Sequence, residues 1–167
     1  MSKRLEIIAN TAIIIVAAVA AVVLVRNLIV RRDARRIPPA IVTGTPLPLS
    51  EMDWRANGRT LVLAVSTSCH YCSESAPFYR RLAAELPRHG VHLTVLLPQE
   101  VSEGRSYLQH LGVPAADIRQ APLRELKIRG TPTLLLVDDR GIIRGVWEGK
   151  LSSDAEQNVL QAAAPAS

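Results

Sequence analysis

Two cysteines, Cys69 and Cys72, place the tightest constraint on the fold, because they are the only cysteines among 167 residues and lie three positions apart. An apolar run over residues 60–66 precedes them and predicts a buried strand. Apolar residues at helical spacing over residues 73–86 follow them and predict a helix. The sequence therefore predicts both thiols on a strand-to-helix turn, where free backbone N–H groups and the helix dipole stabilise a thiolate.

A single close pair of cysteines is too few for a disulfide-stapled scaffold, and it leaves three interpretations open. It is a redox couple, half of a metal site, or a structural coincidence. A zinc site would need two more ligands. The sequence offers no second paired motif, and the histidines outside the pair, His89, His92 and His110, have no mutual ligand spacing. No metal site is therefore expected.

The N-terminal part of the chain predicts a membrane anchor. Residues 7–25 are apolar and carry no charge, and as a helix at about 1.5 Å per residue they would span roughly 28 Å, close to the hydrocarbon thickness of a bilayer. The alternative is a signal peptide cleaved after Ala20, but the apolar run continues for five residues past that position. We therefore expect an uncleaved anchor in residues 1–30, an Arg/Pro-rich linker in residues 31–50, and a folded domain in residues 51–167.

The net charge of +5 belongs to the anchor region. Residues 1–36 carry seven Lys/Arg and two Asp/Glu, whereas residues 37–167 carry thirteen of each. A folded part with balanced charge has no electrostatic footprint for nucleic acid, so no nucleic-acid partner is expected. Arginines beside an apolar segment are expected to meet anionic lipid head groups.

The rest of the chain alternates strand and helix signals. After the first strand and helix, the pattern predicts strands over residues 92–97, 133–137 and 142–147, a short helix over residues 103–111, a helical turn at 122–127 and a hairpin turn at 138–141. Ser152 or Ser153 can cap a last helix that ends at about residue 163. A β-α-β crossover followed by a hairpin and a helix predicts an α/β fold. We expect a central mixed sheet of four or five strands with helices on both faces.

A second motif lies about sixty residues after the cysteines, where Gly130-Thr131-Pro132-Thr133 directly precedes an apolar strand. An X-Pro bond in such a tight turn is a plausible site for a cis peptide. Together with the Cys69-His70-Tyr71-Cys72 motif, this loop resembles the thioredoxin superfamily, and more closely its membrane-anchored TlpA/ResA-like thiol–disulfide oxidoreductases. The resemblance covers about residues 47–163.

The resemblance implies a role for each matched residue. Cys69 would be the exposed nucleophile and Cys72 the buried resolving thiol, the two forming a redox-active disulfide. Pro132 would be the cis-proline packed against them, and Thr131 would offer backbone hydrogen bonds to a substrate strand. No dissociable cofactor would be needed, because the cysteine pair is itself the redox group.

The resemblance also implies where and on what the protein acts. It implies exchange of disulfides with protein substrates at the extracytoplasmic face of the cytoplasmic membrane, in cytochrome c maturation or redox-enzyme assembly. Apocytochrome c or a membrane electron donor would be the partner. Five arginines after the apolar segment oppose this orientation, because the positive-inside rule places them in the cytoplasm. The alternative function is a membrane-tethered thioredoxin-fold binding or chaperone module in which the cysteines contribute little.

Two residues near the cysteines are candidates for tuning the chemistry. His70 would stabilise the Cys69 thiolate and make the couple more oxidising, or it is an exposed residue that merely fills the turn. ResA-like proteins carry a glutamate three residues after the second cysteine, but this chain has Ser75 there. Glu74 is a weak candidate for a proton relay, since a shift of one residue turns a helical side chain by about 100°. Tyr71 is expected to be a surface or substrate contact.

Overall fold

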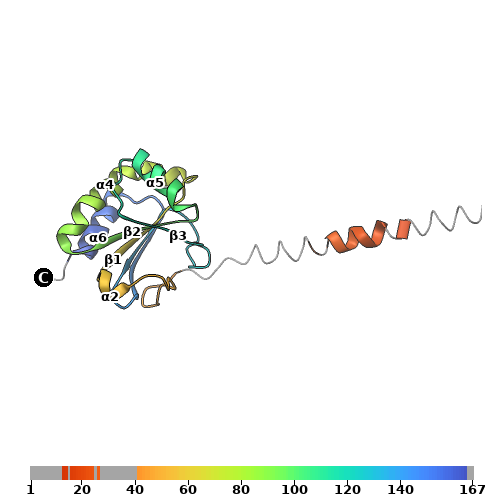
Figure 1. Ribbon diagram of the computed structural model, residues 1–167, viewed down its shortest axis with the longest axis horizontal. Coiled ribbons are helices and arrows are strands. Elements are labelled where there is room, and N and C mark those ends of the chain that lie inside the picture. The colour runs from red at the N-terminus through yellow and green to blue at the C-terminus, as the bar shows by residue number, and fades with distance from the viewer. Residues whose placement is uncertain (1–12, 15, 25, 27–40, 165–167) are drawn as a thin grey trace, which may run out of the picture. The chain divides into compact units, whose positions relative to one another are not determined.

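The computed structural model describes residues 13–14, 16–24, 26 and 41–164 (Figure 1). The chain divides into two units, residues 1–37 and 38–167. In the first unit the described residues are helical, but none of the helices built from described residues combines the length and the hydropathy that crossing a membrane requires. The rest of the expected anchor, and residues 31–40 of the expected linker, lie outside the described residues.

The second unit is built on a five-stranded mixed sheet, which confirms the sheet expected from the sequence. Its strands are β1 (Thr60–Ala64), β2 (His92–Leu97), β3 (Asp117–Gln120), β4 (Thr133–Val137) and β5 (Ile143–Glu148), in the order β3-β2-β1-β4-β5. β2 runs parallel to β1 and to β3, whereas β4 is antiparallel to β1 and to β5. Every residue of the central strands β1 and β4 is buried, which explains their continuous apolar sequences.

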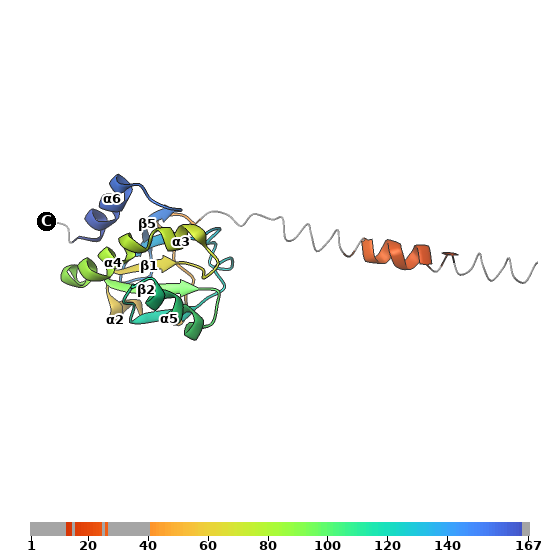
Figure 2. The ribbon, with the colours of Figure 1, turned by 90° about the horizontal axis from the view of Figure 1, so that it is seen from above.

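One face of the sheet is covered by regular helical segments. These are α3 (His70–Glu74), α4 (Ala76–Glu85), the 3₁₀ helix η1 (Leu86–His89), α5 (Val101–His110) and α6 (Ser153–Ala163). The chain moves in one direction from β1 to β2 to β3, and right-handed crossovers then place α4 and α5 on the same face. Figure 1 shows both helices on that side, and Figure 2 looks onto it. Val159 and Ala163 of α6 pack into the same core cluster as Leu82 and Leu108.

The opposite face is covered by the short helix α2 (Trp54–Asn57) and by irregular chain. Ile41, Leu47, Leu123 and Ile128 are buried there against the sheet. Residues 41–50, assigned to the linker from their prolines, are therefore packed onto the folded unit. The Leu47 N–H donates to the Gly141 carbonyl oxygen at 2.9 Å. The compact unit therefore includes residues 41–50, because apolar residues between the prolines bury themselves against the sheet.

The helix expected over residues 73–86 is divided at Ser75 into α3 and α4. Pro77 occupies the first turn of α4, where its missing N–H costs nothing. In an unbroken helix its ring would clash with the Ser73 carbonyl. The strand β3 was not predicted, because Ile118 is its one apolar residue and no alternation is visible in Asp117–Gln120.

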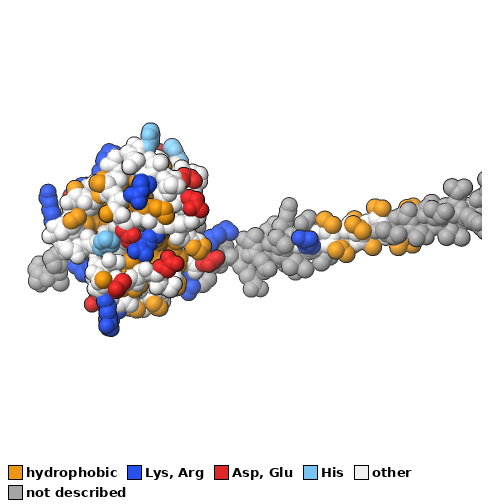
Figure 3. Space-filling model, in the orientation of Figure 1, with side chains coloured by type: hydrophobic (Ala, Val, Ile, Leu, Met, Phe, Trp, Pro, Cys, Tyr) orange, Lys and Arg blue, Asp and Glu red, His pale blue; other side chains and the backbone are white. Residues whose placement is uncertain are grey.

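Charged side chains of both signs are interspersed over the face of the folded unit seen in Figure 3. This distribution agrees with the balanced charge of residues 37–167. We see no single-sign stripe on that face.

Candidate thiol–disulfide site

The two cysteines lie on the turn that connects β1 to α3. The turn is closed by the Cys69 N–H, which donates to the Ser66 carbonyl oxygen at 3.1 Å. Cys69 is the N-cap of α3, and a disulfide joins it to Cys72, with the two Cα atoms 5.2 Å apart. The strand-to-helix placement predicted from the sequence is therefore what the structure has.

The two sulfur atoms lie in different surroundings. Cys72 is 0% exposed and belongs to the core cluster beneath the helices. Cys69 is partly exposed at the margin of that cluster. The Cys72 N–H donates to Cys69 Sγ at 3.1 Å. An incoming thiol or disulfide can therefore reach Cys69, and this N–H stabilises a thiolate there, whereas burial disfavours a thiolate at Cys72.

The Thr131-Pro132 loop meets the cysteines at the same end of the sheet. β4 begins directly after this loop, and its Thr133 pairs with Ala64 at the end of β1. The Thr131-Pro132 peptide bond is cis, and Pro132 is buried. The Thr131 carbonyl oxygen lies 3.2 Å from Cys69 Sγ. In the reduced protein this carbonyl can accept a hydrogen bond from the Cys69 thiol but not from its thiolate, so it opposes the effect of the Cys72 N–H.

Glu74 pairs with surface residues and not with Cys72, the thiol that a proton relay would have to serve. Its carboxylate lies 2.8 Å from Lys150 Nζ and 3.1 Å from His70 Nε2, on the surface. The hydrogen bond from Lys150, helped by the nearby His70, holds the pKa of Glu74 below its usual range. Because Glu74 is a weak base held by two surface groups, whereas Cys72 is in the core, the structure gives no support to the proposed relay.

His70 lies on the solvent side of the turn, with 80% of its side chain exposed. Its Nε2 is directed at Glu74 rather than at a sulfur atom. Any effect of His70 on the Cys69 thiolate would therefore act through charge across the turn, and Glu74 would partly neutralise that charge. Tyr71, in the same turn, is 58% exposed.

Sequence reasoning missed Tyr79, which is 1% exposed and lies in the same core cluster as Cys72. Its hydroxyl is the buried side-chain polar atom for which the described residues provide no hydrogen-bond partner. Burial raises the pKa of Tyr79, and Ser75 opposes this only in part. The Ser75 hydroxyl donates to the Tyr71 carbonyl oxygen at 2.8 Å, and no hydrogen bond joins it to the Tyr79 hydroxyl, which has no partner among the described residues. The spacing of seven residues from Cys72, two helical turns, was a signal that could have identified it.

The buried polar residues of the described chain are Thr60, Ser75, Thr94 and Thr133, and none of them is a carboxylate. A buried acid next to Cys72 is therefore absent from the part of the chain that the structure describes. Because its pKa is raised, Tyr79 stays protonated at neutral pH and cannot take a proton from Cys72. The cysteine pair must pass its protons by another route.

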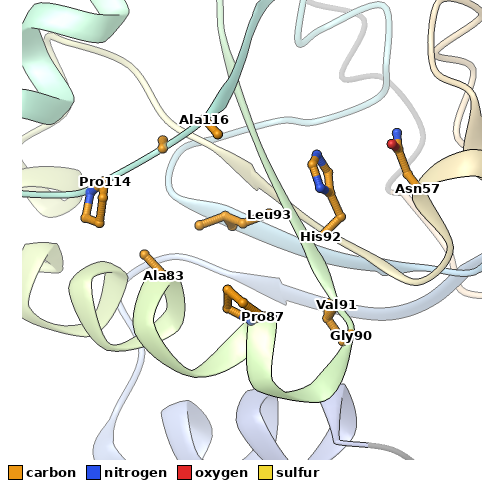
Figure 4. A pocket seen from close by; sticks show the side chains of 10 residues that line it. Asn57, Ala83, Pro87, Gly90, Val91, His92, Leu93, Pro114 and Ala116 are labelled. Atoms are coloured by element: carbon orange, nitrogen blue, oxygen red, sulfur yellow. The ribbon is translucent and has the colours of Figure 1, made fainter.

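Other features do not belong to this site. A pocket of 710 Å³ is lined by His92 and Leu93 at the start of β2, and by Pro87 and Pro114 (Figure 4). It is at the opposite end of the strands from Cys69, because His92 pairs with Thr60, the first residue of β1.

Across residues 13–26 and 41–164, as far as they are described, no three His, Cys, Asp or Glu residues gather in a way that could hold a metal ion.

Comparisons with known proteins give matches among solved structures. No family model matches the chain, and no curated protein matches it. The thioredoxin domain of a thiol-disulfide oxidoreductase from Bacteroides vulgatus is 16% identical, with a TM-score of 0.58 over 74% of this chain and 98% of that one. StoA from Bacillus subtilis is 14% identical, with a TM-score of 0.52 over 75% and 96%.

A secreted Mycobacterium tuberculosis disulfide oxidoreductase is 15% identical, with a TM-score of 0.51 over 72% of this chain and 95% of that one. Structural similarity at such low sequence identity shows a shared fold. It confirms that the folded unit has the thioredoxin-like fold expected from the cysteine and Thr131-Pro132 motifs.

Proposed function

We propose that this protein is a thiol–disulfide oxidoreductase that exchanges disulfides with protein substrates through Cys69 and Cys72. The observation that carries the proposal is the asymmetry of the pair. One sulfur is accessible at the N-cap of α3 and accepts a backbone N–H, while the other is 0% exposed. The fold shared with thiol–disulfide oxidoreductases supports the same proposal.

In the reducing direction, the Cys69 thiolate attacks one sulfur of a substrate disulfide. A Cys69–substrate disulfide forms, and the other substrate sulfur leaves as a thiolate that takes a proton from solvent. Cys72, once deprotonated, then attacks Cys69 Sγ and releases the second substrate thiolate. The substrate disulfide gains two electrons, and the protein dithiol becomes the Cys69–Cys72 disulfide. The oxidising direction is the reverse of these steps.

The geometry suits both steps. The exposed side of Cys69 admits the substrate, and the cis Thr131-Pro132 loop lies against the same sulfur. Cys72 is covered by the core on its other sides, so it meets the substrate only through Cys69. The intermediate is therefore resolved within the protein rather than by a second substrate.

We further propose that residues 7–25 anchor the protein in the cytoplasmic membrane, with residues 38–167 on the extracytoplasmic side. Support comes from the uncharged apolar run and from the likeness in fold to a secreted disulfide oxidoreductase. The arginines after the run favour the opposite orientation. A reporter fused after Ser167 that is active only outside the cytoplasm would support the proposal, and activity only inside would overturn it.

An extracytoplasmic thiol couple requires a source or acceptor of electrons. A membrane electron donor, or apocytochrome c with its paired cysteines, is the partner proposed from the resemblance to TlpA/ResA-like proteins. Incubating the Cys72→Ala variant with a membrane extract would trap such a partner as a disulfide at Cys69. Trapping that is equal in Cys69→Ala/Cys72→Ala would contradict this proposal.

The proposed activity is tested by insulin reduction with dithiothreitol as electron source. We expect wild-type protein to accelerate the reaction and Cys69→Ala to lose the acceleration, with Ser68→Ala as a matched control in the same turn. Activity that is unchanged in Cys69→Ala would favour the alternative function, a tethered binding or chaperone module.

A further inference from the structure

A groove of 540 Å³ opens beside the candidate redox site. Gly130 and Thr131 line it, and the Thr131 carbonyl oxygen is the atom that lies 3.2 Å from Cys69 Sγ. Ser66, whose carbonyl oxygen closes the cysteine turn, lines it as well. A protein segment joined to Cys69 through a disulfide can therefore extend its neighbouring residues directly into the groove.

The floor and walls of the groove come from irregular chain on the non-helical face of the sheet. Leu123 and Ile128 are buried beneath it, and Pro98 and Pro122 form exposed walls. Proline has no backbone N–H, so these walls present carbon atoms rather than hydrogen-bond donors. A surface of this kind suits the side chains of an extended peptide.

The charged residues of the groove are Arg124, Arg129 and Glu125, all exposed. Arg124 makes no ion pair with any residue that the structure describes. Among the described residues, Arg129 makes one ion pair, with Glu148 at 3.9 Å, and both side chains are more than 40% exposed. Two guanidinium groups thus line the groove against the single carboxylate of Glu125, so the lining is net positive. A guanidinium group is well shaped to bind a carboxylate.

We propose, on the basis of the proposed function, that this groove selects the substrates of Cys69. Its occupant is an extended protein segment that carries an acidic side chain within a few residues of the reacting cysteine. The carboxylate pairs with Arg124 or Arg129, and a neighbouring apolar side chain lies over Leu123 and Ile128. Basic side chains at the same position are rejected by the two arginines.

The test uses the full chain in detergent, reduced and carrying Cys72→Ala, so that reaction stops at the mixed disulfide. The probes are acetylated peptides whose single cysteine is joined to thionitrobenzoate, with Glu, Gln or Lys next to the cysteine. The Cys69 thiolate attacks the peptide sulfur, a Cys69–peptide bond forms, and thionitrobenzoate leaves with the electron pair as a coloured thiolate. The rate of colour release is the readout, and mass spectrometry verifies the Cys69–peptide product.

We expect the Glu peptide to react about fivefold faster than the Lys peptide at low salt, given the usual strength of exposed ion pairs. The charge reversal Arg124→Glu/Arg129→Glu should invert the order. The control Arg88→Glu/Arg105→Glu changes two other exposed arginines and the same net charge, and it should keep the wild-type order.

Equal rates for the Glu and Lys peptides would overturn the groove proposal, and so would inversion in the control variant, which would indicate a long-range charge effect. Reaction of Cys69 with dithionitrobenzoic acid, a small disulfide that needs no groove, separates the two proposals. If that reaction proceeds while peptide selectivity is absent, the proposed function stands and only the groove proposal fails. If Cys69 does not react even with the small disulfide, the proposed function itself fails.

Discussion

One face of the sheet is covered by α3 to α6, and the other by α2 and irregular chain. The helical face buries Cys72, Tyr79 and Leu82 in one continuous cluster. The other face is covered by residues 41–49 and 121–128, which form neither helix nor regular strand. The two faces meet at the end of β1, where Cys69 and Thr131 lie in contact. The helical face therefore sets the positions of the sulfur atoms, whereas the irregular face can shape the groove that we propose selects substrates.

The largest expected effect tests the helical face. Leu82 is 0% exposed at the centre of its cluster, so Leu82→Ala should lower the free energy of unfolding by about 4 kcal/mol. Leu123 is 8% exposed beneath the groove, where irregular chain can collapse onto the removed volume, so Leu123→Ala should cost about 2 kcal/mol. Urea unfolding of each variant measures both values.

The two leucine variants should also differ in activity. Leu123→Ala should slow exchange with peptides more than exchange with a small disulfide, because it alters the floor of the groove. Leu82→Ala, where it remains folded, should affect both substrates alike. Equal losses of stability at the two positions would contradict the contrast between the faces.

A smaller effect is expected at Tyr79, on the helical face. Its buried hydroxyl has no partner in the described chain, so Tyr79→Phe removes an unpaired polar group and should raise the free energy of unfolding by about 1 kcal/mol. The change keeps the ring and its packing. Chemical denaturation checks this expectation, with Tyr107→Phe as the control, because the Tyr107 hydroxyl lies 3.2 Å from the Ser73 hydroxyl. A loss of stability in Tyr79→Phe would show that the hydroxyl is paired.

The smallest expected effect concerns Glu74, at the exposed end of the site. Its pKa in the folded protein is lowered from the usual 4.5, mainly by Lys150. A lowered pKa means that Glu74 stabilises the folded state above the unfolded pKa and loses this contribution as the pH falls through the folded value. Glu74→Gln should therefore flatten the loss of stability below about pH 4.5, and leave stability at pH 7 nearly unchanged because the pair is exposed.

Thermal unfolding of the wild-type and Glu74→Gln proteins between pH 2 and pH 7 measures this difference. Lys150→Gln serves as the matched variant, because it removes the main cause of the lowered pKa. A curve for Glu74→Gln that is parallel to the wild-type curve throughout would contradict the assigned ion pair.

Elements of the fold could be predicted from the sequence where the local residue pattern favours the same structure that tertiary packing requires. The continuous apolar runs of β1, β2 and β4 predicted the centre of the sheet, because buried strands need such residues on both sides. The placement of Cys69 at a helix start also followed from local signals. The last helix also begins at a local signal, because the Ser152 hydroxyl accepts from the Ala155 N–H as an N-cap should.

Other features could not be predicted because they depend on distant partners. Strand β3 exists because it pairs with β2, not because its own four residues favour a strand. Ile41 and Leu47 are buried by a sheet that lies far along the chain. The partners of Glu74 come in part from Lys150, which is 76 residues away. The groove needs segments around Ser66, Pro98 and Thr131 to meet.

The central claim is that Cys69 attacks and Cys72 resolves, and a trapping experiment with the two single variants tests it most directly. Reduced Cys72→Ala and Cys69→Ala proteins are each incubated with a peptide disulfide, and the disulfide-linked product is quantified by mass spectrometry. The account predicts that Cys72→Ala accumulates a stable peptide adduct at Cys69, while Cys69→Ala forms little or none because Cys72 is 0% exposed. Equal adduct formation at the two cysteines, or preferential formation at Cys72, would contradict it.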